Sequence, residues 1–211
     1  MTPGLVALCP PCREALVASD DGCPGCGRPL SDPGTPCPRC QAHPPPYRSL
    51  SAVMVYGGTG RDLVIRLKHG HRPDLARSLG TWMAVVAHRR RLVGPDTVVV
   101  PVGPWPAHTV QRGYSAPVLL AREVARRTGA PWIPDLLVRV RSPGDPHGSR
   151  QARAEVVQGA WDLRRPRRVL GRSVLLVDDV MTTGATVSEV SRRLTHAGAR
   201  QVDVLVLARV D

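Results

Sequence analysis

The sequence predicts an α/β fold in which helices cover both faces of a mostly parallel sheet, with a small cysteine-rich unit in front of it. Segments with helical patterning alternate with short, nearly continuous apolar runs, which are typical of parallel strands buried on both faces. All six cysteines lie within the first 40 residues, and this clustering predicts the appended unit. A chain of 211 residues is long enough for one α/β domain and such an appendage.

The cysteines form three pairs with the spacing Cys-x2-Cys, and glycine and proline surround two of the pairs. Turns of this kind direct two thiolates at one zinc ion. A disulfide framework is the competing interpretation, and it needs an oxidising compartment. The first residues lack the basic start and apolar core of a secretory signal, so we expect a cytoplasmic protein and a structural zinc site. The pairs are Cys9 and Cys12, Cys23 and Cys26, and Cys37 and Cys40.

One tetrahedral zinc ion is saturated by four thiolates, so one of the three pairs is left over. We expect Cys23, Cys26, Cys37 and Cys40 to bind the metal, because both of these pairs have proline-flanked turns. A site that combines Cys9 and Cys12 with either later pair is the open alternative. A proline-rich stretch at 41–48 predicts the domain boundary. We therefore divide the chain into a zinc ribbon with its linker, 1–46, and an α/β domain, 47–211.

The first half of the α/β domain opens with an apolar strand at 51–57. A helix at 61–70 follows, with Leu63, Val64 and Leu67 on its apolar face, and a second helix covers 73–91. The run TVVVPV at 97–102 is a buried strand that ends in proline. These elements alternate as parallel sheets require.

The second half continues the pattern. An amphipathic helix at 116–128 is closed by Gly129, and a helix at 184–197 is closed by Gly198. Apolar runs predict strands at the remaining positions, 136–140, 173–179 and 202–210.

The net charge of +12 lies in the α/β domain, because residues 1–46 hold three arginines against four acidic residues. This excess favours an anionic partner, either a phosphate-rich small molecule or nucleic acid. Arginine-rich coding bias is a second explanation, since the chain has a single lysine, Lys68. No apolar run approaches the roughly 18 residues of a membrane helix, so we expect no membrane insertion.

The segment 174–186, VLLVDDVMTTGAT, carries the clearest chemical pattern. A buried strand delivers Asp178 and Asp179 at its carboxyl end, where ligands bind in open α/β sheets. The following turn offers backbone N–H groups, threonine hydroxyls and a helix N-terminus to a phosphate. The two carboxylates suit a ribose diol or a divalent cation instead. The predicted contact residues are Asp178, Asp179, Met181, Thr182, Thr183, Gly184, Ala185 and Thr186.

This segment resembles the loop that binds phosphoribosyl diphosphate (PRPP) in type I phosphoribosyltransferases. Over almost its whole length, the chain is similar to the ComF family, which joins a zinc ribbon to a phosphoribosyltransferase-like domain and is linked to DNA uptake. The similarity includes the LK pair before Gly70, the RGYSA segment at 112–116 and the arginine-bearing stretch at 148–163. Family members commonly have four Cys-x2-Cys pairs and an RGFNQ segment, so this chain lacks one pair and the two amide side chains.

The resemblance implies that the protein binds PRPP, or a related ribose 5-phosphate ligand, together with Mg²⁺. Asp178 and Asp179 would hold the ribose hydroxyls, and Lys68 and Arg112 would contact the diphosphate. Those four residues are the predicted catalytic set for transfer of a phosphoribosyl group to an acceptor. The alternatives are a sensor of PRPP or nucleotides without catalysis, and a DNA-uptake accessory protein that binds single-stranded DNA or an uptake helicase.

Overall fold

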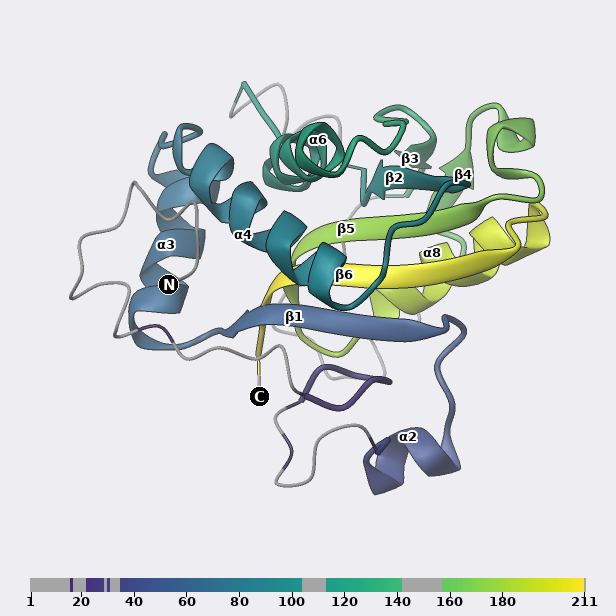
Figure 1. Ribbon diagram of the computed structural model, residues 1–211, viewed down its shortest axis with the longest axis horizontal. Helices are drawn as coiled ribbons and strands as arrows, with labels where there is room; N and C mark the ends of the chain where they lie inside the picture. The colour runs from purple at the N-terminus through teal and green to yellow at the C-terminus, as the bar shows by residue number, and fades with distance from the viewer. Residues whose placement is uncertain are drawn as a thin grey trace.

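The centre of the protein is a four-stranded sheet with the strand order β1-β6-β5-β2 (Figure 1). All neighbouring strands are parallel, so their carboxyl ends meet at one edge of the sheet, where β1 leads into the helix that follows it. The computed structural model describes residues 16, 22–28, 30, 35–103, 113–141 and 157–210. The strands are β1 (Ser49–Val55), β2 (Thr97–Pro101), β5 (Ser173–Met181) and β6 (Gln201–Arg209).

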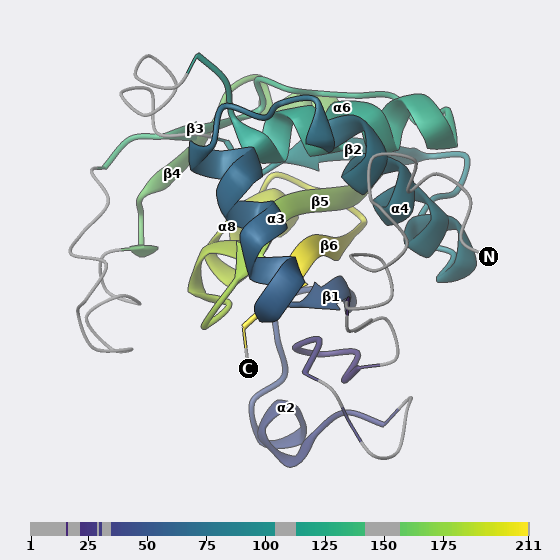
Figure 2. The ribbon, with the colours of Figure 1, turned by 90° about the vertical axis from the view of Figure 1, so that its left-hand side faces the viewer.

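Three helices cover one face of the sheet: α3 (Gly58–His69), α4 (Leu75–Arg89) and α6 (Ala116–Thr128) (Figures 1 and 2). The predicted apolar face of α3 is confirmed, because Leu63, Val64 and Leu67 are all buried. Helices α4 and α6 pack closely at Gly80, where an added Cβ would stand 2.6 Å from the Cβ of Glu123. The buried residues of α3 share one apolar core with residues of β5 and β6, which holds this helix against the sheet.

The other face is covered by α8 (Ala185–His196), by a short antiparallel pair and by the cysteine-rich unit. The antiparallel pair consists of β3 (Leu137–Arg139) and β4 (Trp161–Leu163). The cysteine-rich unit includes α2 (Pro38–Ala42) and lies beside the outer strand β1 (Figure 1). Its cysteines share one apolar core with strands of the sheet and with α8, so the unit is packed onto the α/β domain.

The predicted α/β class, with a mostly parallel sheet and cover on both faces, is confirmed. The predicted strand at 136–140 exists as β3, but within the described part of the chain it pairs only with β4 and lies outside the main sheet. Three short elements were not predicted: α2, β4 and a 3-10 turn at Pro166–Val169. They have three to five residues each, and packing rather than local pattern determines them. Among the described residues, no helix has the length and apolarity to cross a membrane.

Candidate functional site

The central feature of the site is the pair of adjacent carboxyl groups near the end of β5. Asp178 and Asp179 are only 8% and 5% exposed, although β5 has no other charged residue. Alternate residues of a strand point to opposite faces, and Asp179 faces α3 while Asp178 follows the residues that face α8. The backbone N–H of Asp179 donates a 2.9 Å hydrogen bond to Oδ1 of Asp178. The strand therefore places two buried carboxyl groups near the edge of the sheet at which the parallel strands end.

Burial and charge raise the pKa of Asp178 to about 8. Burial is the larger cause, because it disfavours the charged carboxylate, and the neighbouring Asp179 adds repulsion. Lys68 and the Asp179 N–H act in the opposite direction but do not offset these effects. A carboxyl group with this pKa gains or loses its proton near neutral pH, which is typical of ligand-binding and catalytic positions.

Lys68, near the end of α3, lies directly at this carboxyl pair. Its Nζ is 2.8 Å from Oδ1 of Asp179. Burial acts to lower the pKa of Lys68, but the Asp179 carboxylate outweighs it and the pKa is raised. The ammonium group is thus held charged at the edge of the site, with 29% of its side chain open to solvent. The structure brings together three of the four residues predicted to be catalytic.

The turn after β5 has a buried inner side and an accessible outer side. Gly184 is buried and has a φ of +81°, a left-handed conformation that favours glycine. The Met181 side chain is 4% exposed and lies beneath it, since Met181 Cε would be 2.7 Å from a Cβ at Gly184. Thr182 is exposed, and Thr183 accepts a 3.3 Å hydrogen bond from the N–H of Ala185.

Helix α8 begins directly at Ala185, so the predicted contact residues Ala185 and Thr186 form its first turn. Both are partly exposed. The N–H groups of a first helical turn have no partner within the helix, and they carry the positive end of the helix dipole. The arrangement presents these groups and the threonine hydroxyls on one side of the carboxyl pair, which suits an anionic group such as phosphate.

Tyr114 connects the segment before α6 to the end of α3. Its hydroxyl donates a 2.6 Å hydrogen bond to the carbonyl oxygen of Leu67, the residue before Lys68. The predicted diphosphate contact Arg112 lies outside the described residues, and so do Cys9 and Cys12.

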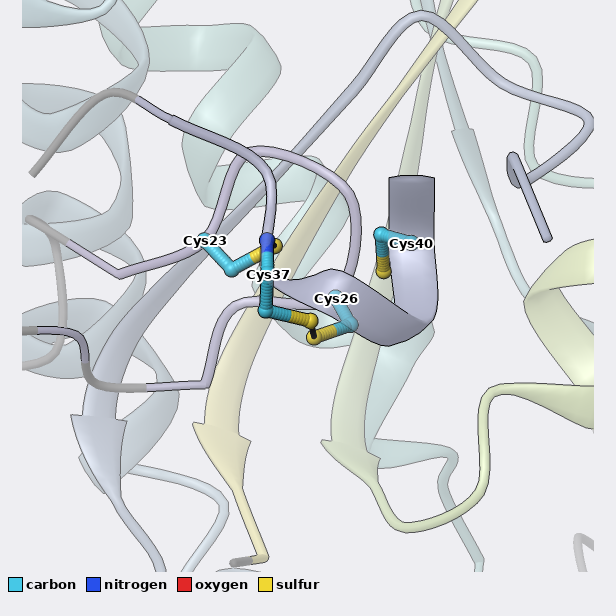
Figure 3. A group of neighbouring side chains, drawn as sticks. All are labelled: Cys23, Cys26, Cys37 and Cys40. Carbon is cyan, nitrogen blue, oxygen red and sulfur yellow. Dashed lines mark hydrogen bonds between the residues drawn. The ribbon is translucent and has the colours of Figure 1, made fainter. Parts of the chain in front are cut away.

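A second site is formed by Cys23, Cys26, Cys37 and Cys40 (Figure 3). All four residues are buried, and their sulfur atoms lie within 4.8 Å of one another. These are the four cysteines that the sequence predicts to bind the metal. The sulfurs of Cys26 and Cys37 are 3.8 Å apart, too far for a disulfide.

The geometry of this cluster fits a tetrahedral metal. Zinc–sulfur bonds of about 2.3 Å place two sulfur ligands about 3.8 Å apart, which is the separation of Cys26 and Cys37. The backbone N–H of Cys37 also donates to the sulfur of Cys23 at 3.2 Å. Burial raises the pKa of the thiols of Cys26 and Cys40, so four thiolates together need a bound cation. The cluster can hold a metal ion such as zinc.

The turn between Cys23 and Cys26 is anchored to the α/β domain through three consecutive carbonyl groups. The backbone N–H of Leu50 in β1 donates to Pro24 at 2.7 Å, and the hydroxyl of Tyr47 donates to Gly25 at 2.8 Å. The third donor is Nε of Arg209 in β6, which binds the carbonyl of Cys26 at 2.8 Å. The bond from Leu50 also pairs one backbone N–H at the outer edge of β1.

Sequence reasoning missed Tyr47 and Arg209. Tyr47 follows the proline-rich stretch, and Arg209 closes the last strand, so neither belongs to a recognisable motif. Arg209 is one of 28 arginines, and the only local signal for it is its place in an apolar strand. Its partners are far away in the sequence, so only the fold reveals them.

Comparison with known proteins gives three results. Residues 116–211 match the family model described as phosphoribosyl transferase domain. The chain is 33% identical over 208 residues to DNA utilization protein YhgH of Escherichia coli (strain K12), covering 96% of this chain and 90% of that protein. It is 26% identical over 207 residues to Competence protein F of Haemophilus influenzae, with the same coverage of both chains.

A solved structure with a related arrangement is glutamine phosphoribosylpyrophosphate (PRPP) amidotransferase from B. subtilis. The sequence identity is 22% and the TM-score is 0.45. The similarity covers 68% of this chain and 30% of that structure.

Proposed function

Since this chain belongs to the ComF family and carries a phosphoribosyl transferase domain, we propose that it binds Mg²⁺–PRPP at the carboxyl end of β5. The family membership and the phosphoribosyltransferase-like fold, both predicted from sequence, are confirmed. The observation that carries the proposal is the arrangement of two buried carboxyl groups, a lysine and a glycine–threonine turn at one strand end. Zinc is the metal we assign to the four-cysteine cluster, where it supports the fold.

Each part of the site suits one part of the ligand. The turn from Thr182 to Thr186 would hold the 5′-phosphate through N–H groups, hydroxyls and the helix dipole. Asp178 and Asp179 would accept hydrogen bonds from the 2′- and 3′-hydroxyls of the ribose. Lys68 would move its charge from Asp179 towards the diphosphate, which is the most negative part of the ligand. Bound Mg²⁺ would supply positive charge to the ribose and diphosphate oxygens.

The reaction we propose is transfer of the phosphoribosyl group to an acceptor. The bond between C1′ and the diphosphate oxygen breaks, diphosphate leaves with the electron pair, and C1′ gains oxocarbenium character. The acceptor then bonds to C1′ and gives up its proton. The protein contributes position and electrostatic stabilisation, since Lys68 is placed to bind the leaving diphosphate and the carboxylates stabilise the positive ribose. A PRPP sensor would use the same site to bind the ligand, but would have no acceptor and would transfer nothing.

Calorimetric titration of Mg²⁺–PRPP into the zinc-loaded protein tests the ligand. We expect micromolar binding, and a loss of at least tenfold in affinity for Asp178→Asn and Asp179→Asn. Asp96→Asn is the matched control, because Asp96 is an exposed acid at the opposite edge of the sheet, 3.3 Å from Arg200. Absence of binding to folded, zinc-loaded protein would overturn the proposal. Diphosphate release during an acceptor screen then separates an enzyme from a sensor.

A second candidate function is binding of single-stranded DNA, and two observations favour it. The similar proteins are named for DNA utilization and competence. Two arginine clusters of this chain are also exposed, at 89–91 and at 164–168. Fluorescence anisotropy with a labelled oligonucleotide tests this function. Affinity that falls steeply with salt and is unchanged in Asp178→Asn would support it, and no binding at low salt would contradict it.

A further inference from the structure

Arg209 lies between the two sites described above and contacts both of them. It is the last residue of β6 and is 2% exposed. Its Nε donates to the carbonyl of Cys26 at 2.8 Å, and its Nη1 donates to the carbonyl of Met181 at 3.4 Å. Cys26 belongs to the metal cluster, and Met181 is the last residue of β5 before the phosphate turn. One buried guanidinium group therefore spans the metal cluster and the start of the turn.

The chain of contacts continues from Met181 into the turn. The Met181 side chain lies beneath Gly184, close enough that a Cβ on Gly184 would be 2.7 Å from it. The carbonyl of Met181 also accepts the N–H of Val210 at 2.9 Å, so the end of β5 is fixed from two directions. A shift of Met181 would be transmitted to Gly184, since the side chain and the glycine have no free space between them.

On the metal side, Arg209 is one of three donors that hold the Cys23–Cys26 turn. The other two, Leu50 and Tyr47, bind the carbonyls of Pro24 and Gly25. A metal bound by the four cysteines would fix the same turn from its inner side. The position of the Cys26 carbonyl, and with it that of the guanidinium group, then depends on whether the metal is bound.

Arginine is suited to this position because its guanidinium group is planar and rigid. Nε and Nη1 donate in fixed relative directions, so the two carbonyls are held at a defined separation. A lysine ammonium is a single point on a flexible stem and cannot fix two acceptors in the same way. Loss of the guanidinium would leave the buried carbonyl of Cys26 without this donor.

We propose that Arg209 is a positioning residue that couples metal binding at the cysteine cluster to the geometry of the phosphate turn at 182–186. With metal bound, Arg209 holds Met181 and so keeps the turn in its ligand-ready form. Loss of the metal releases the Cys26 carbonyl and loosens the turn. Because such coupling is reciprocal, a ligand in the turn must also strengthen the binding of metal at the cysteine cluster. This last consequence rests on the proposed function, whereas the coupling to the turn does not.

Amide hydrogen exchange of the full chain tests the coupling without any ligand. We compare the zinc-loaded protein, the chelator-treated protein and the variants Arg209→Met and Arg209→Lys. We expect chelation and either substitution to speed exchange at 182–187 by at least fivefold, while β5 and β6 stay protected. Removing zinc from either variant with the chelator should speed exchange at 182–187 by less than a further twofold. Arg77→Met is the control, because it removes an exposed arginine of α4, which packs on the face of the sheet opposite the cysteines.

Unchanged exchange at 182–187 after chelation of the wild-type protein would overturn the proposal, even if both variants fail to fold. So would full additivity of chelation and substitution. A second measurement is an equilibrium competition for zinc between the protein and a coloured chelator. Mg²⁺–PRPP should raise the zinc affinity of the wild type several-fold and leave that of the Arg209 variants unchanged. If Mg²⁺–PRPP does not bind the wild type at all, the proposed function fails, and the exchange result still decides the role of Arg209.

Discussion

Two kinds of buried acid lie in the neighbouring strands β5 and β6, at opposite edges of one sheet. Asp203, at the amino end of β6, is 1% exposed and accepts hydrogen bonds from Arg48, Ser49 and Gln201 at 2.6–2.9 Å. Asp178, near the carboxyl end of β5, is also buried, but its charged form is opposed by burial and by Asp179. The difference indicates that Asp203 stabilises the fold, whereas the buried Asp178 costs stability, as we expect of an acid that serves the proposed ligand site.

Glu123, between α4 and α6, resembles Asp203, because it is also a buried acid with several hydrogen-bond donors. Hydrogen bonds from Arg126 chiefly, with Arg127 and Thr81, lower its pKa to about 2 against the penalty of burial. Its folded-state pKa is below the ordinary value, so its contribution is present above about pH 4.5 and is lost as the pH falls towards 2. An acid whose pKa is lowered by its partners stabilises the folded protein at neutral pH. The pKa of Asp178 is raised instead, so its ionisation destabilises the folded protein.

The largest loss of stability is expected from Asp203→Ala. The substitution removes a bidentate ion pair with Arg48 and two further hydrogen bonds, and should lower the free energy of unfolding by about 3–4 kcal/mol. Urea unfolding followed by circular dichroism measures it. The affinity for Mg²⁺–PRPP should be unchanged in the fraction that remains folded. A loss below about 1 kcal/mol would show that Asp203 is not the structural acid of this comparison.

Asp178→Asn should have the reverse effect and stabilise the protein as the pH rises. The folded wild type keeps a proton on Asp178 up to about pH 8, whereas the unfolded chain releases it near pH 3.8. The stability of the wild type therefore falls as the pH rises from about 3.8 to about 8, and Asp178→Asn does not show this fall. Since each pKa unit corresponds to about 1.4 kcal/mol, we expect a gain of about 5 kcal/mol at pH 8 and little gain at pH 4, measured by urea unfolding.

Asp96→Asn serves as the control for this prediction, since it makes the same substitution at an exposed acid near the opposite edge of the sheet. A gain for Asp178→Asn that is the same at pH 4 and pH 8 would contradict the account. It would mean that the substitution acts through packing rather than through the carboxyl charge.

A smaller effect is expected from Gly184→Ala. Alanine is strained at a φ of +81°, and its Cβ would meet the Met181 side chain, so we expect a loss of about 1–2 kcal/mol in stability. Ligand affinity should fall by more than stability does, because the turn itself is displaced. Gly171→Ala is the matched control, since Gly171 has a φ of +70° but open space around it. If Gly184→Ala and Gly171→Ala changed the ligand affinity equally, the turn would not be part of the ligand site.

Prediction from sequence succeeded where the chemistry lies in one continuous segment. The end of β5, the turn and the start of α8 follow one another between 174 and 186, so their placement at one edge follows from the strand and helix patterns. The four clustered cysteines were chosen from the turn chemistry of their own two pairs. Lys68 lies more than 100 residues before Asp179, and the family resemblance rather than periodicity placed it at the site.

The features that sequence reasoning missed depend on partners far away in the chain. Arg209 acts through Cys26 and Met181, and Asp203 acts through Arg48 and Ser49, with no pattern in the sequence that connects them. The strand at 136–140 was predicted, but its partner β4 has only three residues and no recognisable periodicity. The division at residue 46 stays a prediction, although the two parts share one core.

The most direct test of the contrast between the two acids is a titration of the Asp178 carboxyl carbon by ¹³C NMR, assigned with Asp178→Asn. The account predicts a pKa near 8 without ligand, because burial and Asp179 oppose ionisation. Saturating Mg²⁺–PRPP should lower this pKa by at least two units, since the ligand binds the ionised carboxylate. A pKa near 3.8 without ligand, or one that Mg²⁺–PRPP leaves unchanged, would contradict the assignment of Asp178 to the ligand site.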